Sequence, residues 1–130
     1  MNLREAQPQE FNYLIEYLRE NKVTYKEYLE SDHWKETRQK RLSMPFCFCE
    51  VCGWGTHLNV HHNTYKNIGK EKMSDLTILC HNHHREVHEM TSRGMGIKEA
   101  VRKLGDNLRA LRQEQRHKNR RKKGKNKRKN

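Results

Sequence analysis

Apolar residues are scarce in this chain. They make up 32% of its 130 residues, charged residues make up 34%, and the mean hydropathy is −1.27. No apolar stretch approaches the roughly 20 residues that span a bilayer, and residues 1–6 lack the apolar segment of a signal peptide. We therefore expect a cytoplasmic protein without a membrane span. A chain this small and polar buries little core, so we also expect a metal to stabilise it.

Cysteine is rare as well, and three of the four thiols lie within residues 47–52. Disulfides seldom persist in the reducing cytoplasm. Metal binding is then the expected use of these thiols, which are Cys47, Cys49, Cys52 and Cys80.

Acidic residues are missing from residues 116–130, which contain ten of the 28 Lys and Arg residues. Most of the net charge of +12 therefore lies in this segment. Basic side chains that bind phosphates release counterions, so such segments typically contact nucleic acid. We expect a disordered tail that binds nucleic acid or, alternatively, only improves solubility. The tail residues assigned to nucleic-acid binding are Arg120, Arg121, Lys122 and Lys123.

Helical patterns occupy the start of the chain. Apolar side chains recur at helical spacing in residues 8–21, and Thr24 with Glu27 matches a capping box. Another helix is expected over residues 31–42. We therefore predict a helical N-terminal lead-in over residues 1–45. Two basic residues of its last helix are candidate phosphate contacts, namely Arg38 and Arg41.

Residues 46–92 are expected to form the central unit. Residues 58–62 alternate as in a strand, residues 76–79 form a second short apolar run, and residues 81–90 have helical potential. The intervening loop, residues 63–74, carries lysines that either contact phosphate or form an ordinary solvated surface. These are Lys66, Lys70 and Lys72.

An apolar stripe runs through residues 93–115, where five apolar residues recur at spacings of 4, 3, 4 and 3. They are Ile97, Val101, Leu104, Leu108 and Leu111. This spacing predicts an amphipathic helix. The helix either docks on its own domain or joins two copies of the chain as a homodimer.

Two pairs of metal-type ligands have the spacing of zinc knuckles. Two residues separate Cys49 from Cys52, and two residues separate Cys80 from His83. Two such pairs can close a tetrahedral zinc site. Four protein ligands leave no position for water or substrate, so this site should be structural and should contribute to folding. Spacing alone leaves two alternatives open, which are Cys47 in place of Cys49 and His81 in place of His83.

Histidines form a second group. Residues at i and i+4 share a helix face, so His84 and His88 can bind one ion together. Adjacent strand residues point to opposite faces, so His61 and His62 should not both bind that ion. The geometry predicts that one of them binds the metal and the other points toward a substrate.

The stretch from Cys49 to His88 contains the segments CEVCG, LNVHHNTY, SDLTILCHNHH and HHREVH. In this order they resemble the HNH endonucleases, also called ββα-metal nucleases, and the preceding WKETRQKRL is similar to the lead-in of many phage and prophage members. The resemblance covers about 40 of the 130 residues. It implies an α+β fold with a small ββα-metal, treble-clef-like core, flanked by N-terminal helices, a C-terminal helix and the basic tail.

The resemblance also implies a role for each matching residue. His61 takes the first metal-ligand position, His62 takes that of the general base, and His84 and His88 complete the ligands of the catalytic metal. Asp75 takes the position of the family's middle Asn, which holds the base and its loop. Its carboxylate could orient the imidazole as a triad Asp does, reach the metal or weaken activity.

The implied function is metal-dependent hydrolysis of DNA phosphodiester bonds, with double-stranded DNA as substrate and 5′-phosphate and 3′-hydroxyl products. His62 would accept a proton from the attacking water. The expected cofactors are a structural Zn²⁺ and a catalytic divalent metal, which is Mg²⁺, Mn²⁺, Ni²⁺ or Zn²⁺. A phage or mobile element, including the homing type, is the expected source, and a bacterial or phage-infected cell the expected host. A non-catalytic zinc-ribbon module that binds DNA is the alternative, and it would not need His62.

Overall fold

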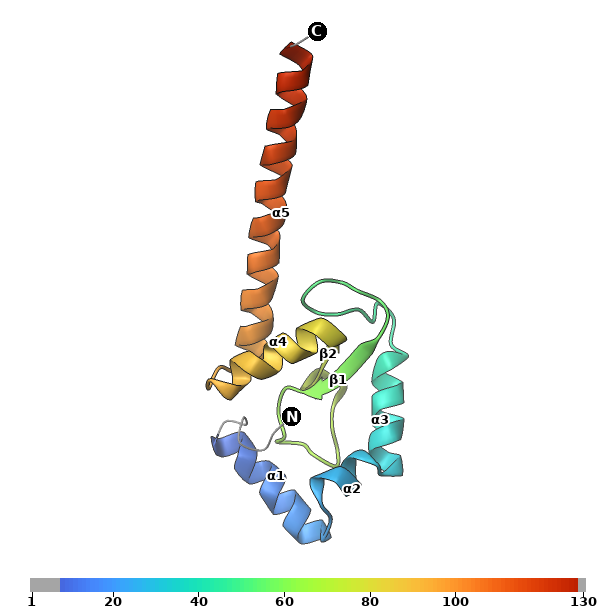
Figure 1. The fold of residues 1–130 in the computed structure, drawn as a ribbon. Coiled ribbons are helices and arrows are strands. Elements are labelled where there is room, and N and C mark those ends of the chain that lie inside the picture. Colours follow the sequence, from blue (N-terminus) through green and yellow to red (C-terminus); the bar gives the residue numbers. More distant parts are fainter. Residues whose placement is uncertain (1–7, 129–130) are drawn as a thin grey trace.

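A computed structural model gives the fold of the protein and describes residues 8–128. Five helices and a two-stranded antiparallel sheet make it an α+β structure (Figure 1). In chain order the elements are α1 (Pro8–Asn21), α2 (Tyr25–Leu29), α3 (Asp32–Leu42), β1 (Leu58–His62), the 3₁₀ turn η2 (Met73–Asp75), β2 (Leu76–Cys80), α4 (His81–Ser92) and α5 (Ile97–Arg128). Within residues 8–128, none of these helices combines the length and the apolar character needed to cross a membrane.

Side-chain caps set the starts of the two short N-terminal helices. The Thr24 hydroxyl accepts from the Glu27 N–H, and the Glu27 carboxylate accepts from the Thr24 N–H, which is the capping box that the sequence predicts. The Ser31 hydroxyl accepts from the Trp34 N–H and starts α3. These caps fix where Tyr28 and Trp34 enter the core.

The sheet carries the metal-type ligands into the interior. β1 and β2 pair with His62 opposite Leu76 and with Leu58 opposite Cys80. Every residue of β2 is buried, whereas in β1 only His61 and His62 are. The histidine pair therefore lies at the buried end of β1, and Cys80 lies directly before α4.

Two hydrophobic cores flank this sheet. The first joins α1, α2 and α3 to the loop after β1 through Leu14, Tyr28, Trp34, Tyr65, Ile68 and Leu76. The second joins the cysteine-containing loop, α4 and α5 through Cys49, Leu79, Cys80, Val87 and Ala100. The N-terminal helices are thus part of the folded unit rather than an appendage to it.

The helix α5 is longer than the sequence predicts. Its first turns dock on the second core through Ile97, Val101 and Leu104, whereas Leu111 is 60% exposed. Where a disordered tail was expected from residue 116, α5 continues to Arg128 and extends away from the rest of the fold (Figure 1). Residues 112–123 contain no proline and are rich in helix-forming Arg, Lys, Gln and Glu. Residues 129–130 lie outside the described residues.

Candidate metal centres

The predicted zinc ligands form one compact cluster. Cys49 and Cys52 come from the loop between α3 and β1, Cys80 ends β2, and His83 lies in the first turn of α4. Their four ligand atoms all lie within 4.8 Å of one another. The His83 Nδ1 atom is 3.3 Å from Cys80 Sγ and 3.7 Å from Cys49 Sγ, and Cys52 Sγ is 3.9 Å from Cys80 Sγ. We call these four residues the Cys/His cluster.

The spacing of these atoms fits a tetrahedral zinc ion. With Zn–S and Zn–N bonds of about 2.3 Å and 2.0–2.1 Å, tetrahedral ligand atoms lie roughly 3.5–3.8 Å apart. Burial raises the pKa of the Cys52 thiol to about 11, and the neighbouring Cys49 and Cys80 thiols reinforce the shift. Burial alone would also raise the pKa of Cys49, but backbone N–H groups, including that of Cys80, lower it to about 7. A thiolate is therefore accessible near neutral pH, and thiolate is the form that binds zinc.

The two alternative zinc ligands lie outside the cluster. Cys47 is partly buried and His81 is exposed, and neither belongs to the four-residue group. The loop that holds Cys49 closes through the Gly53 N–H, which donates to the Cys49 carbonyl at 2.8 Å. Gly53 has a φ of 77°, a conformation that favours glycine, so the CEVCG segment shapes the knuckle.

His61, His84 and His88 form a second compact group, here called the His cluster. Their ligand atoms lie within 4.8 Å of one another, and the Nε2 atoms of His84 and His88 are 3.1 Å apart. Burial lowers the pKa of His61 to about 3 and that of His84 to about 4, and the charges of neighbouring histidines add to both shifts. Both imidazoles are therefore neutral at pH 7, which is the form that binds metal ions.

One orphaned atom supports metal binding by the His cluster. The Nδ1–H of His61 donates to the His62 carbonyl at 2.9 Å, so the Nε2 atom of His61 carries a free lone pair. This Nε2 atom is fully buried, and it has no hydrogen-bond partner among the described residues. A buried unsatisfied acceptor costs free energy, and a cation would relieve that cost. Three imidazoles leave further coordination positions open, as in catalytic centres.

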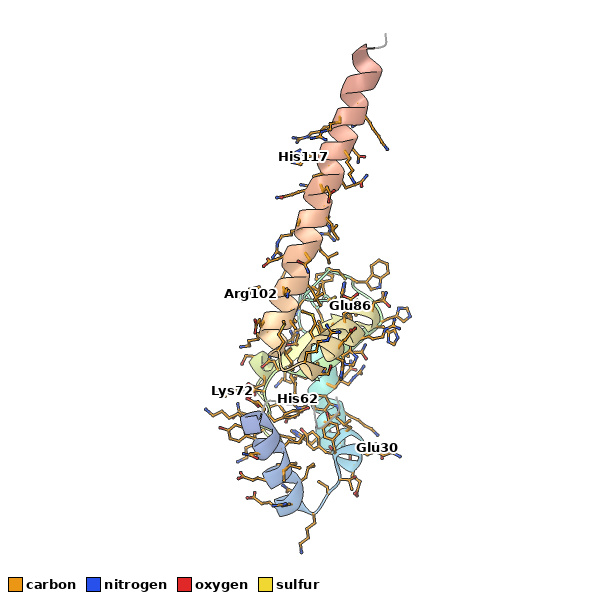
Figure 2. All side chains as sticks on the ribbon, turned by 60° about the vertical axis from the view of Figure 1, so that its left-hand side comes forward. Glu30, His62, Lys72, Glu86, Arg102 and His117 are labelled. Carbon is orange, nitrogen blue, oxygen red and sulfur yellow. The ribbon has the colours of Figure 1, made fainter. Side chains whose placement is uncertain are left out.

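His62 has a different environment from His61, as the alternation of strand side chains predicts. Its ring is 3% exposed and stacks between Trp34 at 4.5 Å and Tyr65 at 4.9 Å, measured between ring centroids. Its Nε2 atom lies 2.8 Å from the Oε2 atom of Glu71. In Figure 2 His62 lies inside the folded part of the molecule, between the N-terminal helices and the sheet. His62 and His61 both line a cavity of about 210 Å³.

Asp75 holds the loop but is not bonded to His62. Its Oδ2 atom accepts from the Lys72 N–H at 2.9 Å and from the Asn67 Nδ2 at 3.0 Å. Of the roles expected for Asp75, these bonds match the holding of the loop, whereas the carboxylate bonded to His62 is that of Glu71. No motif or spacing singles out Glu71, which lies in an irregular loop.

The predicted nucleic-acid contacts are spread over the molecule. Arg38 lines the His61 and His62 cavity together with His84. Arg41 instead donates to the Leu76 carbonyl and lines a separate cavity. The remaining predicted contacts are all exposed: Lys66, Lys70 and Lys72 on the loop, and Arg120, Arg121, Lys122 and Lys123 on the extended part of α5.

Comparisons of the chain with protein-family models, with curated proteins and with solved structures found no match.

Proposed function

We propose that this chain is a metal-dependent endonuclease of the HNH type that hydrolyses DNA phosphodiester bonds. The observation that carries the proposal is the histidine pair at the end of β1. His61 belongs to a three-imidazole group with open positions, and His62 lines the same cavity without belonging to that group. A metal-binding group beside a separate buried imidazole is what metal-assisted hydrolysis requires.

The local topology supports the HNH assignment. β1 supplies His61 and His62, β2 pairs with β1, and α4 follows directly with His84 and His88. This is a strand, strand and helix order around one cluster of ligands, as in ββα-metal nucleases. The Cys/His cluster joins the loop before β1 to the start of α4, so zinc there would fix the two elements that carry the His cluster.

The residues around the cavity divide the chemistry of hydrolysis among them. His61, His84 and His88 would hold a divalent ion, which would stabilise negative charge on the phosphate and on the leaving oxygen. His62 would accept the proton of the attacking water. The Arg38 guanidinium lines the same cavity and would contact a phosphate oxygen. The exposed basic residues of α5 would add affinity that does not depend on sequence and falls as salt rises.

The experiment is plasmid cleavage by the full-length chain and by His62→Ala, with EDTA, Mg²⁺, Mn²⁺, Ni²⁺ or Zn²⁺. We expect wild type to cut with at least one metal and not with EDTA. The variant should keep its fold and DNA binding but lose roughly 100-fold or more in rate. His57→Ala is the matched control, because His57 is exposed and belongs to neither cluster. It should cut like wild type.

Two results would overturn the proposal. Normal cutting by His62→Ala would remove His62 from the base role. No cutting by a folded, zinc-loaded wild type with any of the metals would favour a zinc-ribbon module that only binds DNA.

A further inference from the structure

We propose that Glu71 is a positioning residue that fixes the His62 imidazole in the tautomer with its proton on Nε2. The inference rests on the proposed function for its catalytic meaning, since only a base needs a defined free nitrogen. It concerns a residue that no sequence pattern singles out. The structural claim, however, can be tested without any cleavage assay.

The Glu71 carboxylate is buried and fully bonded. Its side chain is 1% exposed. The Oε1 atom accepts from the Gly69 N–H at 2.9 Å and from His33 Nε2 at 2.8 Å. The Oε2 atom accepts from the Tyr28 hydroxyl and from His62 Nε2 at 2.8 Å. A carboxylate has about four lone-pair positions, and these four donors occupy them.

The charge state of Glu71 determines which nitrogen of His62 carries the proton. Burial alone would raise the pKa of Glu71, but hydrogen bonds from His62, Tyr28 and His33 outweigh burial and lower it to about 2. At neutral pH the carboxylate is therefore ionised and can only accept hydrogen bonds. The Nε2 atom of His62 must then be the donor. A neutral imidazole has a single N–H, so Nδ1 is left as the acceptor that could take a proton from water.

The aromatic rings that stack on His62 restrict the orientation of its imidazole. Trp34 and Tyr65 stack on His62 with interplanar angles of 21° and 30°, so the ring is held in one plane. Within that plane the hydrogen bond to Glu71 selects the edge that faces the carboxylate. Stacking sets the plane and Glu71 sets the protonated nitrogen.

The loop that carries Glu71 is itself held in place. Gly69 has a φ of 87°, and a Cβ atom there would lie 2.5 Å from the Tyr17 ring, so only glycine fits between the loop and α1. Tyr28 on α2 and His33 on α3 also bind the carboxylate. Three N-terminal helices therefore determine where Glu71 lies, which explains why they belong to the same folded unit as the histidine pair.

A purely structural role for Glu71 makes a different prediction. If Glu71 only joined the loop to α2 and α3, the loss of any one of its donors would have a similar effect. Tyr28→Phe removes one donor and leaves the contact between Glu71 and His62 intact. We expect Tyr28→Phe to lower stability without changing the His62 tautomer, and Glu71→Gln to change the tautomer.

The experiment is ¹⁵N NMR of the full-length, zinc-loaded chain with labelled histidine, at one neutral pH. Loss of a signal pair in His62→Ala identifies the His62 nitrogens. Wild type should show the proton of His62 on Nε2, the nitrogen that faces Glu71. Glu71→Gln should show a mixture that includes the Nδ1-protonated form, and kcat for plasmid cleavage should fall roughly 10- to 100-fold while KM changes little. Glu36→Gln, an exposed substitution on α3, should match wild type in both measurements.

Failure of this inference can be told apart from failure of the proposed function. A wild-type His62 with its proton on Nδ1, or with both nitrogens protonated, would overturn the positioning role without any variant. So would a folded Glu71→Gln that keeps the wild-type tautomer and kcat. Where Glu71→Gln does not fold, Glu71→Asp provides the same comparison with a carboxylate one methylene further from His62. A tautomer change in a chain that never cuts DNA would uphold the inference and refute the nuclease.

Discussion

The Cys/His cluster and the His cluster share a helix but differ in kind. His83 and His84 are neighbours on α4, yet their imidazoles belong to different clusters, because adjacent helical residues point about 100° apart. The Cys/His cluster offers four ligand atoms, enough to close a tetrahedral zinc site, whereas the His cluster offers three and would leave positions open. If the proposed function holds, two adjacent residues on one helix separate a structural role from a chemical one.

The clusters also differ in what an absent metal costs. In the Cys/His cluster, burial and neighbouring thiols raise the pKa of Cys52 to about 11, so several thiolates cannot coexist without a cation. In the His cluster the pKa values of His61 and His84 are lowered, so the imidazoles stay neutral and coexist without a cation at neutral pH. We expect the fold to depend on metal in the first cluster and to tolerate its absence in the second.

The largest expected effect is that of Cys80→Ser on stability. Cys80 belongs to the Cys/His cluster and to the second hydrophobic core, so the substitution removes a ligand at the junction of β2 and α4. Structural zinc contributes directly to folding. We expect the loss of one bound zinc and at least about 3 kcal/mol of stability, or a Tm lower by roughly 10 °C or more. Elemental analysis and thermal unfolding measure both.

Cys47→Ser is the matched control for this substitution, because Cys47 lies in the same loop but outside the cluster. It should keep the zinc content of wild type. Unchanged zinc in Cys80→Ser would refute the structural site, and lost zinc in Cys47→Ser would revive the alternative ligand.

We expect His84→Ala to have a smaller effect on the stability of the fold but to abolish metal binding by the His cluster. The substitution removes one of the three imidazoles of the His cluster. Because these imidazoles are neutral, the fold should not need a metal ion at this cluster. We expect the zinc of the Cys/His cluster and the Tm to change little, while the second metal and DNA cleavage are lost. Calorimetric titration with Mn²⁺ or Ni²⁺ and the plasmid assay measure these losses.

The control here is His81→Ala, an exposed histidine at the start of α4 that belongs to neither cluster. A variant His84→Ala that unfolds, or that still binds two metals, would contradict the division between the clusters.

The pairs of ligands within the two clusters could be predicted from the sequence because their geometry is local. A spacing of two residues brings knuckle ligands together, a spacing of four places His84 and His88 on one helix face, and strand alternation separates His61 from His62. The strands and the starts of the helices follow from equally local patterns. Each of these inferences needs only the few residues between the partners. The joining of His61 to His84 and His88 is not local, and it was expected only from the resemblance to HNH endonucleases.

Glu71 could not be predicted because its partners are distant in the chain. Tyr28 lies 43 residues from Glu71 in the sequence and His33 lies 38 residues from it. The loop that carries Glu71, between β1 and η2, has no periodicity in its sequence. The length of α5 also differs from the expectation, since a basic run without acidic residues is typical of disorder, yet residues of high helix propensity continue the helix. An ion pair between Lys118 and Glu114, at 3.4 Å, adds local support.

The smallest expected effect is the pH dependence that the His cluster gives to stability. Unfolded histidine has a pKa of about 6.5, whereas the folded pKa values of His61 and His84 are about 3 and 4. Between these values the unfolded chain binds protons that the folded chain does not, so stability falls as pH falls below about 6.5 and is constant above it. For a chain loaded with one zinc equivalent, we expect a loss of roughly 2–3 kcal/mol between pH 7.5 and 5.5, of which about 1.4 kcal/mol comes from His61 and at most as much from the partly exposed His84. Urea unfolding at each pH measures it.

His61→Gln separates this cause from the other titrating groups. The variant removes the more strongly shifted imidazole, so its loss of stability over the same pH interval should be smaller than that of wild type. Glu71 does not interfere, because its lowered pKa affects stability only below about pH 4.5. His57→Ala removes an exposed imidazole instead and should keep the wild-type slope. An equal slope in His61→Gln would mean that the buried neutral histidines are not the source, and that the contrast between the two clusters does not rest on their charge.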